Sequence, residues 1–153
     1  MSKVALKPST AVDLYETDFY AWTRAQAMSL SVRHEAGLDV VHLIDEVESL
    51  GRAQRAAVES HLRVLIAHLL KFRVQPERAT PSWRITLRTQ RLDIERRLAR
   101  SPSLRGYPAE ILAETYDDAV RLASRETNIE RGRFPQDCPF TLEQILDLEF
   151  YPT

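Results

Sequence analysis

The sequence predicts an all-α fold: an antiparallel bundle of four main helices followed by a short C-terminal helix. Apolar residues recur with helical spacing along most of the 153 residues, and no stretch alternates apolar and polar residues as a strand would. Four glycines leave little turn chemistry for β-hairpins. A chain of this length can close one hydrophobic core unaided. We therefore expect a flexible tail over residues 1–12 and a single helical domain over residues 13–153.

The first helix is expected over residues 13–35. Gly37 follows the last apolar position and is a typical stop signal for a helix. The face of this helix that should point to the core carries Phe19, Trp22, Gln26 and Leu30.

The second helix is expected over residues 39–73, with Asp39 as its N-cap. Gly51 lies in its middle, yet the apolar face keeps the same phase on both sides of the glycine. No Ser, Thr, Asp or Asn directly follows Gly51 to cap a new helix, so we predict one continuous helix. Gly51 falls on its inner face, which indicates either the close approach of another helix or a kink. Such a helix would be ~50 Å long, so one end should protrude, bend or pack on a second chain.

The third helix should begin at Pro81, with Thr80 as its N-cap, and end near Arg100. Folding the chain at the short preceding turn sets Phe72 of the second helix opposite Trp83 of the third. The segment SPSLRGYP is a connector or a frayed helical start, and a fourth helix should span residues 108–127. A coil then leads to the short helix TLEQILDL, whose capping box consists of Thr141 and Gln144.

Polar residues interrupt the apolar faces of the second and third helices. In the stretch ESHLRVLIAHLL, His61 and His68 lie among leucines and share a heptad position with Gln54. Gln90 lies in the middle of the third helix's apolar face, at a level between the two histidines, and Arg91 flanks it. Since an unpaired buried polar group costs ~1–3 kcal/mol, we expect these residues to pair with one another or with water. We call Gln54, His61, His68, Gln90 and Arg91 the interior polar cluster, and a structural role is the favoured interpretation.

Metal and enzyme sites are not favoured. His61 and His68 lie ~10.5 Å apart along the helix axis, so they cannot share one ion unaided. Asp39, His42 and Glu46 have ligand spacing, but they fall on the polar side of their helix. Cys138 is a lone cysteine before a proline, which is typical of a structural residue. We expect no catalytic residues, no metal and no cofactor.

Charge is distributed unevenly along the chain. Residues 77–106 carry eight arginines against three acids, net +5, whereas residues 107–153 carry four arginines against ten acids, net −6. Intramolecular neutralisation is the favoured interpretation, with arginines of the third helix paired to acids of other helices. The candidate acids are Glu46, Glu59, Asp117 and Asp118.

Six segments in order resemble the bacterial family called domain of unknown function 29. They are DLYETDFYAW, LIDEVESLG, ESHLRVLIAHLLKF, SWRITLRTQR, SPSL and FPQDCPFTLEQIL, and together they cover about residues 13 to 152. The resemblance implies an all-helical fold and a bacterial origin. It supplies no activity and no catalytic residues.

Three functions are consistent with the sequence. The first is a protein-interaction module, with an unknown protein or a second copy of the chain as partner. The second is nucleic-acid binding through the Arg-rich third helix, which requires the arginines of residues 84–105 to face solvent. The third is a small-molecule or metal-binding protein, which requires a pocket that opens onto His61, His68 and Gln90.

The cellular compartment can be predicted in outline. No apolar stretch approaches the ~20 residues that span a bilayer, and the first ten residues lack the apolar core of a secretory signal. A single cysteine cannot form an intrachain disulfide. These observations favour a cytoplasmic protein without a membrane partner.

Overall fold

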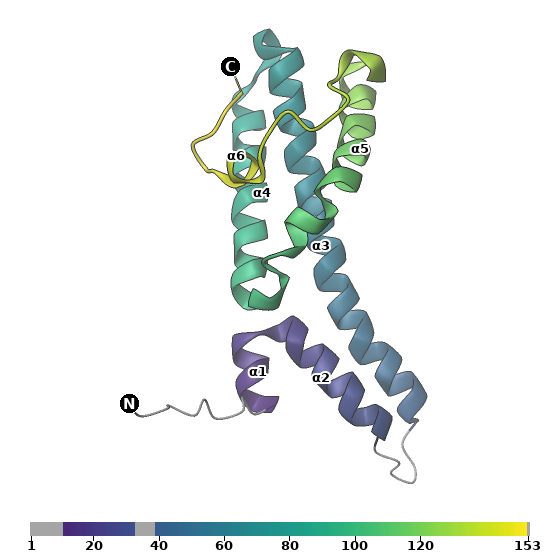
Figure 1. Cartoon of the computed structure of the whole chain (residues 1–153). Coiled ribbons are helices and arrows are strands. Elements are labelled where there is room, and N and C mark those ends of the chain that lie inside the picture. The colour runs from purple at the N-terminus through teal and green to yellow at the C-terminus, as the bar shows by residue number, and fades with distance from the viewer. Residues whose placement is uncertain (1–10, 33–38, 153) are drawn as a thin grey trace, which may run out of the picture.

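The computed structural model describes residues 11–32 and 39–152, and every regular element in these two ranges is helical (Figure 1). The predicted all-α fold is confirmed. Residues 1–10 of the predicted tail lie outside the described residues, and the first helix begins at Ala11. The elements in order are α1 (Ala11–Thr17), α2 (Phe19–Val32), α3 (Val40–Val74), the 3₁₀ turn η1 (Pro76–Arg78), α4 (Pro81–Arg100), the 3₁₀ turn η2 (Pro102–Leu104), α5 (Tyr107–Thr127), the 3₁₀ turn η3 (Arg131–Arg133) and α6 (Leu142–Leu146).

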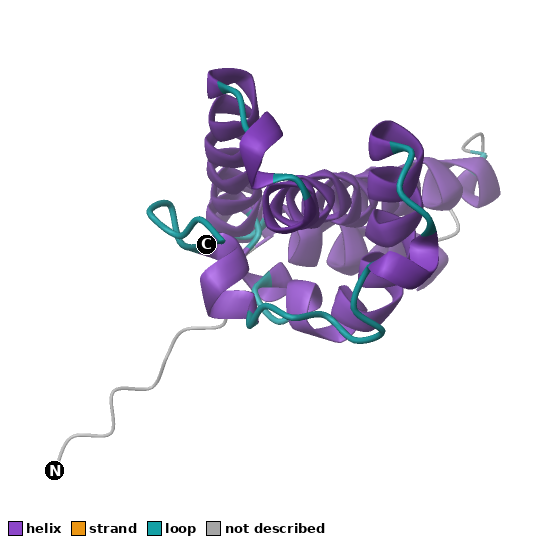
Figure 2. Ribbon diagram, turned by 90° about the horizontal axis from the view of Figure 1, so that it is seen from above, coloured by secondary structure: helices purple, strands orange, loops and turns teal. Residues whose placement is uncertain are grey.

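Helix α3 is the central element of the fold (Figures 1 and 2). α2 packs along its N-terminal half, whereas α4 and α5 pack along its C-terminal half. α4 runs antiparallel to α3, α5 runs in the same direction as α3, and both pack against α3. Most of the largest fully buried side chains lie in this C-terminal half, where α3 alone contributes Val58, Leu62, Leu65, Ile66, Leu69 and Leu70.

α3 is continuous through Gly51, as predicted. Its first turn is capped by Asp39, whose carboxylate accepts the backbone N–H of His42. Gly51 is buried, and a Cβ atom at this position would lie 2.7 Å from Oγ1 of Thr23 in α2. The prediction of a close helix approach is therefore confirmed, since only a residue without a side chain leaves room for Thr23. α2 and the N-terminal half of α3 together form a hairpin, which projects from the bundle made by α4, α5 and the C-terminal half of α3 (Figure 1).

The single first helix predicted over residues 13–35 is wrong, because the chain breaks between α1 and α2 at Asp18. The Asp18 carboxylate caps α2 by accepting the backbone N–H of Ala21 at 2.9 Å. It also accepts the backbone N–H and the hydroxyl of Ser103, at 2.6 and 2.8 Å. The break thus depends on a partner 85 residues away, which helical periodicity cannot reveal. Residues 33–35 lie outside the described residues.

The face of α2 that meets α3 also differs from the prediction. Thr23 and Ala27 are the buried residues of α2, with 1% and 5% of their surface exposed. Small side chains occupy these positions because the two helices approach closely at Gly51. The predicted face of Phe19, Trp22, Gln26 and Leu30 lies to one side of this line and is half-buried.

The turn between α3 and α4 has the predicted register. The Phe72 and Trp83 rings contact each other edge to face, with centroids 5.4 Å apart, so the predicted contact is confirmed. Pro81 occupies the first turn of α4, but the Thr80 side chain does not cap the helix, and its hydroxyl pairs with that of Ser82 instead.

The C-terminal capping box is confirmed. Oγ1 of Thr141 accepts the backbone N–H of Gln144, and Oε1 of Gln144 accepts the backbone N–H of Thr141. α6 is thereby fixed at its start, and Ile145 on its inner face is fully buried in the core.

Candidate functional site

The structure brings two members of the interior polar cluster together across the α3–α4 interface. Nδ1 of His61 donates to Oε1 of Gln90 at 2.7 Å, and both side chains are half-buried. The contact joins the middle of α4 to the helix it packs on. Its direct effect is to fix the register of the two helices.

His68 and Gln54 make separate contacts. Nδ1 of His68 donates to the backbone carbonyl of Val64 at 2.9 Å, within α3. Burial is the main cause that lowers the pKa of His68, and the nearby ammonium of Lys71 lowers it further. Oε1 of Gln54 accepts from the guanidinium of Arg97 at 3.4 Å. The cluster is therefore a set of separate polar contacts, not one continuous network.

Arg91 does not join the histidines. Its side chain is buried, with 2% of the residue exposed, and points to the C-terminal segment. Nε donates to the carbonyl of Ile145 at 2.8 Å, and Nη2 donates to the carbonyl of Phe150 at 2.9 Å. Arg91 thus holds α6 and the chain that follows it against α4. Its role as a clamp for backbone carbonyls could not be inferred from its position beside Gln90.

Ser101 and Lys71 are among the buried polar residues that the sequence reasoning missed. Ser101 is fully buried, and its hydroxyl accepts the backbone N–H of Tyr20 at 3.1 Å. Lys71 is 8% exposed; its Nζ lies 2.8 Å from Oε2 of Glu126 and 4.6 Å from the centroid of the Trp83 ring. The only available signal for Lys71 was its place within the apolar run HLLKF.

The predicted pairing of the third helix's arginines with acids of other helices is wrong. Among the described residues, the side-chain ion pairs of this segment are Arg96 with Asp93 and Arg105 with Glu95. Of the candidate acids, Asp118 pairs instead with Arg121 of its own helix, α5. Within residues 84–105, five arginines are exposed: Arg84, Arg88, Arg96, Arg100 and Arg105.

The projecting hairpin has an apolar stripe that α4 does not cover. Val40, Leu43, Val47 and Leu50 follow one another at spacings of three and four residues on α3, and we call these four residues the hairpin seam. The same stripe continues to Gln54 and His61, which contact Arg97 and Gln90 of α4. α4 ends at Arg100, however, and Leu43 and Leu50 remain 39% and 45% exposed.

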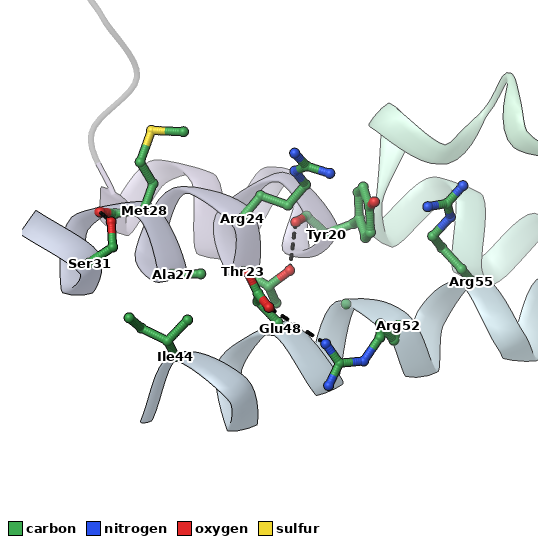
Figure 3. Close-up of a pocket in the computed structure, with 11 residues that line it drawn as sticks. Tyr20, Thr23, Arg24, Ala27, Met28, Ser31, Ile44, Glu48, Arg52 and Arg55 are labelled. Carbon is green, nitrogen blue, oxygen red and sulfur yellow. Dashed lines mark hydrogen bonds and ion pairs between the residues drawn. The ribbon is translucent and has the colours of Figure 1, made fainter. Parts of the chain in front are cut away.

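A pocket of about 450 Å³ lies between α2 and α3 on the other side of the hairpin (Figure 3). On the α3 helical wheel its lining residues Ile44, Glu48 and Arg55 fall on the opposite side of Gly51 from the hairpin seam. Neither this pocket nor the other surface pockets described, of 170 to 470 Å³, are lined by His61, His68 or Gln90.

Residues 11–32 and 39–152 give little support for a metal site, a reactive cysteine or a membrane-spanning helix. No group of three or more His, Cys, Asp or Glu side chains there is arranged to hold a metal ion. His42 contacts Asp39, and both are exposed. The thiol of Cys138 donates to the carbonyl of Phe140, and burial raises its pKa, which disfavours the nucleophilic thiolate. None of the helices in these ranges has the length and apolar character needed to cross a membrane.

The comparison with protein families gives one result. The family model described as domain of unknown function DUF29 matches residues 14–151, nearly the whole chain. The chain belongs to the DUF29 family. No curated protein and no solved structure gives a match. The DUF29 match includes the interior polar cluster, the hairpin seam and the α2–α3 pocket, but the family description assigns none of them a role.

Proposed function

We propose that this DUF29 chain is a protein-interaction module that binds through the hairpin seam. The observation that carries the proposal is the apolar stripe of α3, which continues in register past the end of α4. The covered part of the stripe is occupied by a helix, so the open part has the shape and spacing that suit another helix.

The exposed leucines give the association a driving force. Full burial of a leucine side chain contributes ~1.5–3 kcal/mol. Because Leu43 and Leu50 are 39% and 45% exposed, covering both would contribute roughly 1 kcal/mol each. Val47 and the half-buried Gln26 and Leu30 of α2, which lie on the same side of the hairpin, would extend the contact.

A second copy of the chain is the partner that we propose. Two-fold dimers are the commonest oligomers, and two α2–α3 hairpins stacked on this side would form a four-helix bundle. In an antiparallel arrangement Leu43 of one copy meets Val47 of the other, and Leu50 meets Val40. Only about three helical turns overlap, so the dimer belongs to the small, concentration-dependent class of interfaces.

The test is the molar mass in solution, measured by light scattering at chain concentrations from about 5 to 500 μM. The parent should shift from monomer towards dimer, and Leu43→Glu/Leu50→Glu should remain a monomer throughout. Val41→Glu is the matched control, because Val41 is 76% exposed and lies on the pocket side of the same helix. A parent that stays monomeric, or a Val41→Glu chain that loses the dimer as well, would refute the second copy as partner.

The broader proposal is tested separately by capture from lysate with the same three chains. A protein retained by the parent and by Val41→Glu, but lost with Leu43→Glu/Leu50→Glu, supports an interaction module with a different partner. Identical sets of captured proteins for all three chains, together with a monomeric parent, would exclude the seam as an interface.

Nucleic-acid binding is the second candidate, and the exposed arginines of the α4 segment favour it. Arg88, Arg96 and Arg105 face solvent, as this candidate requires. Four of the five exposed arginines are also engaged. Arg84 lies over the Tyr151 ring and Arg100 over the Phe19 ring. Arg96 pairs with Asp93, and Arg105 pairs with Glu95. Affinity for duplex DNA or RNA that falls steeply between 50 and 200 mM salt, and falls further in Arg88→Gln/Arg96→Gln, would support it.

The third candidate lacks the observation that it requires. None of the pockets described opens onto His61, His68 and Gln90, and two of these residues are occupied with each other. We therefore do not propose a ligand site at the interior polar cluster.

A further inference from the structure

The α2–α3 pocket combines a small-residue floor with a charged rim (Figure 3). Thr23, Ala27 and Gly51 form the floor, and all three are buried. The floor is fixed by the close helix approach at Gly51, which leaves no room for a side chain there. The pocket volume of about 450 Å³ lies within the ~300–1,000 Å³ range of small-molecule sites.

Positive charge exceeds negative charge around this pocket. Arg24, Arg52 and Arg55 line it, with Glu48 as the acid among the lining residues. Arg52 is engaged with two carboxylates, at 3.1 Å from Asp45 and 3.6 Å from Glu48. Arg24 and Arg55 have no such acid partner among the described residues, so two guanidinium charges remain uncompensated.

Arg55 is held in place by an aromatic ring. Its guanidinium carbon lies 4.4 Å from the centroid of the Tyr107 ring at the start of α5. In the view of Figure 3, Arg24 and Arg55 lie on the two sides of the Tyr20 ring at one end of the pocket. A fixed guanidinium loses less conformational freedom when it binds an anion, which favours recognition of a carboxylate or a phosphate.

The other end of the pocket is mainly apolar, with Ser31 as its polar lining residue. Ala27, Met28 and Ile44 line it, and Met28 is 70% exposed. In Figure 3 these three side chains lie together at the opposite end from Arg55. An occupant would therefore place a negative group near Arg24 and Arg55 and an apolar body along Met28 and Ile44.

We propose that the α2–α3 pocket binds a small amphipathic anion, a carboxylate or phosphate head group on an apolar body. The site lies on the side of the hairpin opposite the hairpin seam, so it does not depend on the proposed interaction function. The negative head is recognised by the uncompensated guanidinium groups of Arg24 and Arg55.

Calorimetric titration with three probes tests the proposal. Octanoate carries both parts of the expected ligand, octanol carries only the apolar part, and inorganic phosphate carries only a head group. We expect octanoate to bind at least 10-fold more tightly than either of the other two. Equal affinity for octanol and octanoate would overturn the role of the arginines, and equal affinity for phosphate would overturn the role of the apolar end.

Matched variants assign the binding to this pocket. Arg24→Ala/Arg55→Ala should lose at least 10-fold in octanoate affinity. Arg63→Ala/Arg125→Ala, which removes two exposed arginines from the α3–α5 surface, should bind as the parent does. Equal losses in both double variants, or no loss in either, would refute the assignment.

A measurement on the parent chain guards against a variant that fails to fold. Titration with octanoate should shift the NMR signals of the Arg24 and Arg55 side-chain N–H groups and leave that of Arg63 unchanged. Shifts spread equally over all three arginines would contradict a defined site. The mass measurement of the seam variants is unaffected by this outcome, so the two proposals fail independently.

Discussion

Replacing Gly51 by alanine separates the intrinsic preference of a helix from the demands of packing. In an open helix interior, alanine is favoured over glycine by ~1 kcal/mol. Here the new Cβ atom would lie 2.7 Å from Oγ1 of Thr23, which is well inside van der Waals contact. That hydroxyl cannot swing away freely, because Thr23 is 1% exposed and its hydroxyl donates to the carbonyl of Tyr20 at 2.8 Å.

The magnitudes favour destabilisation. Overpacking typically costs ~1–3 kcal/mol, and losing the Thr23 hydrogen bond costs ~0.5–1.5 kcal/mol. Against a gain of ~1 kcal/mol from helix propensity, we expect Gly51→Ala to lower the free energy of unfolding by about 0.5–3.5 kcal/mol. With Thr23→Ala already in place the obstructing atom is absent, so Gly51→Ala should become neutral or stabilising by up to ~1 kcal/mol.

The assay is urea unfolding followed by circular dichroism for the parent, both single variants and the double variant. The coupling between the two sites should therefore be about 0.5–4.5 kcal/mol. Thr23→Ser is the matched control, because it keeps the hydroxyl and should retain most of the penalty. If Gly51→Ala stabilises the parent and the Thr23→Ala chain to the same extent, α2 does not approach α3 at Gly51 and the hairpin geometry is wrong.

Three further changes test other parts of the fold. Trp83→Ala should lower the free energy of unfolding by about 3–5 kcal/mol, since the ring packs edge to face on Phe72, and an unchanged thermal melt would contradict the α3–α4 register. Arg91→Met keeps much of the side-chain volume but removes the donors to three backbone carbonyls, those of Gln144, Ile145 and Phe150. We expect a loss of about 2–4 kcal/mol in the free energy of unfolding and faster amide hydrogen exchange after residue 140, whereas exchange equal to that of the parent would exclude the clamp. Burial lowers the pKa of His68, so below the unfolded value of ~6.5 the unfolded chain binds the proton more readily and stability should fall as the pH decreases. In unfolding experiments between pH 7 and 5.5, the free energy of unfolding should fall less steeply for His68→Leu than for the parent. Equal pH dependence in the two chains would show that His68 has the same pKa in the folded and the unfolded state.

Features that depend on neighbours along the chain could be predicted from the sequence. The continuity of α3 follows from the unbroken phase of its apolar face across Gly51, because successive turns of a helix place residues in a fixed angular order. The capping box at Thr141 is likewise a matter of residues three apart. The Phe72–Trp83 contact could be derived because the connecting turn is short, and a short turn leaves two antiparallel helices little freedom of register.

Features that depend on distant partners were decided only by the tertiary structure. Asp18 breaks the first helix because Ser103 supplies two further donors to its carboxylate, and nothing near Asp18 in the sequence reports that partner. Arg91 lies on the helix face that carries Gln90, yet the carbonyls it serves belong to a segment more than 50 residues later.

The same distinction between local and distant determinants applies to the hairpin seam. The heptad spacing of the hairpin seam is visible in the sequence, since Val40, Leu43, Val47 and Leu50 recur at three and four residues. The length of α4 and the turn before it decide how far α4 covers this stripe of α3. Only the folded chain therefore shows that the hairpin seam lies beyond the end of α4. The sequence determines which side chains share a helix face, because that geometry is local, whereas the face that finds a partner depends on how the helices are placed in space.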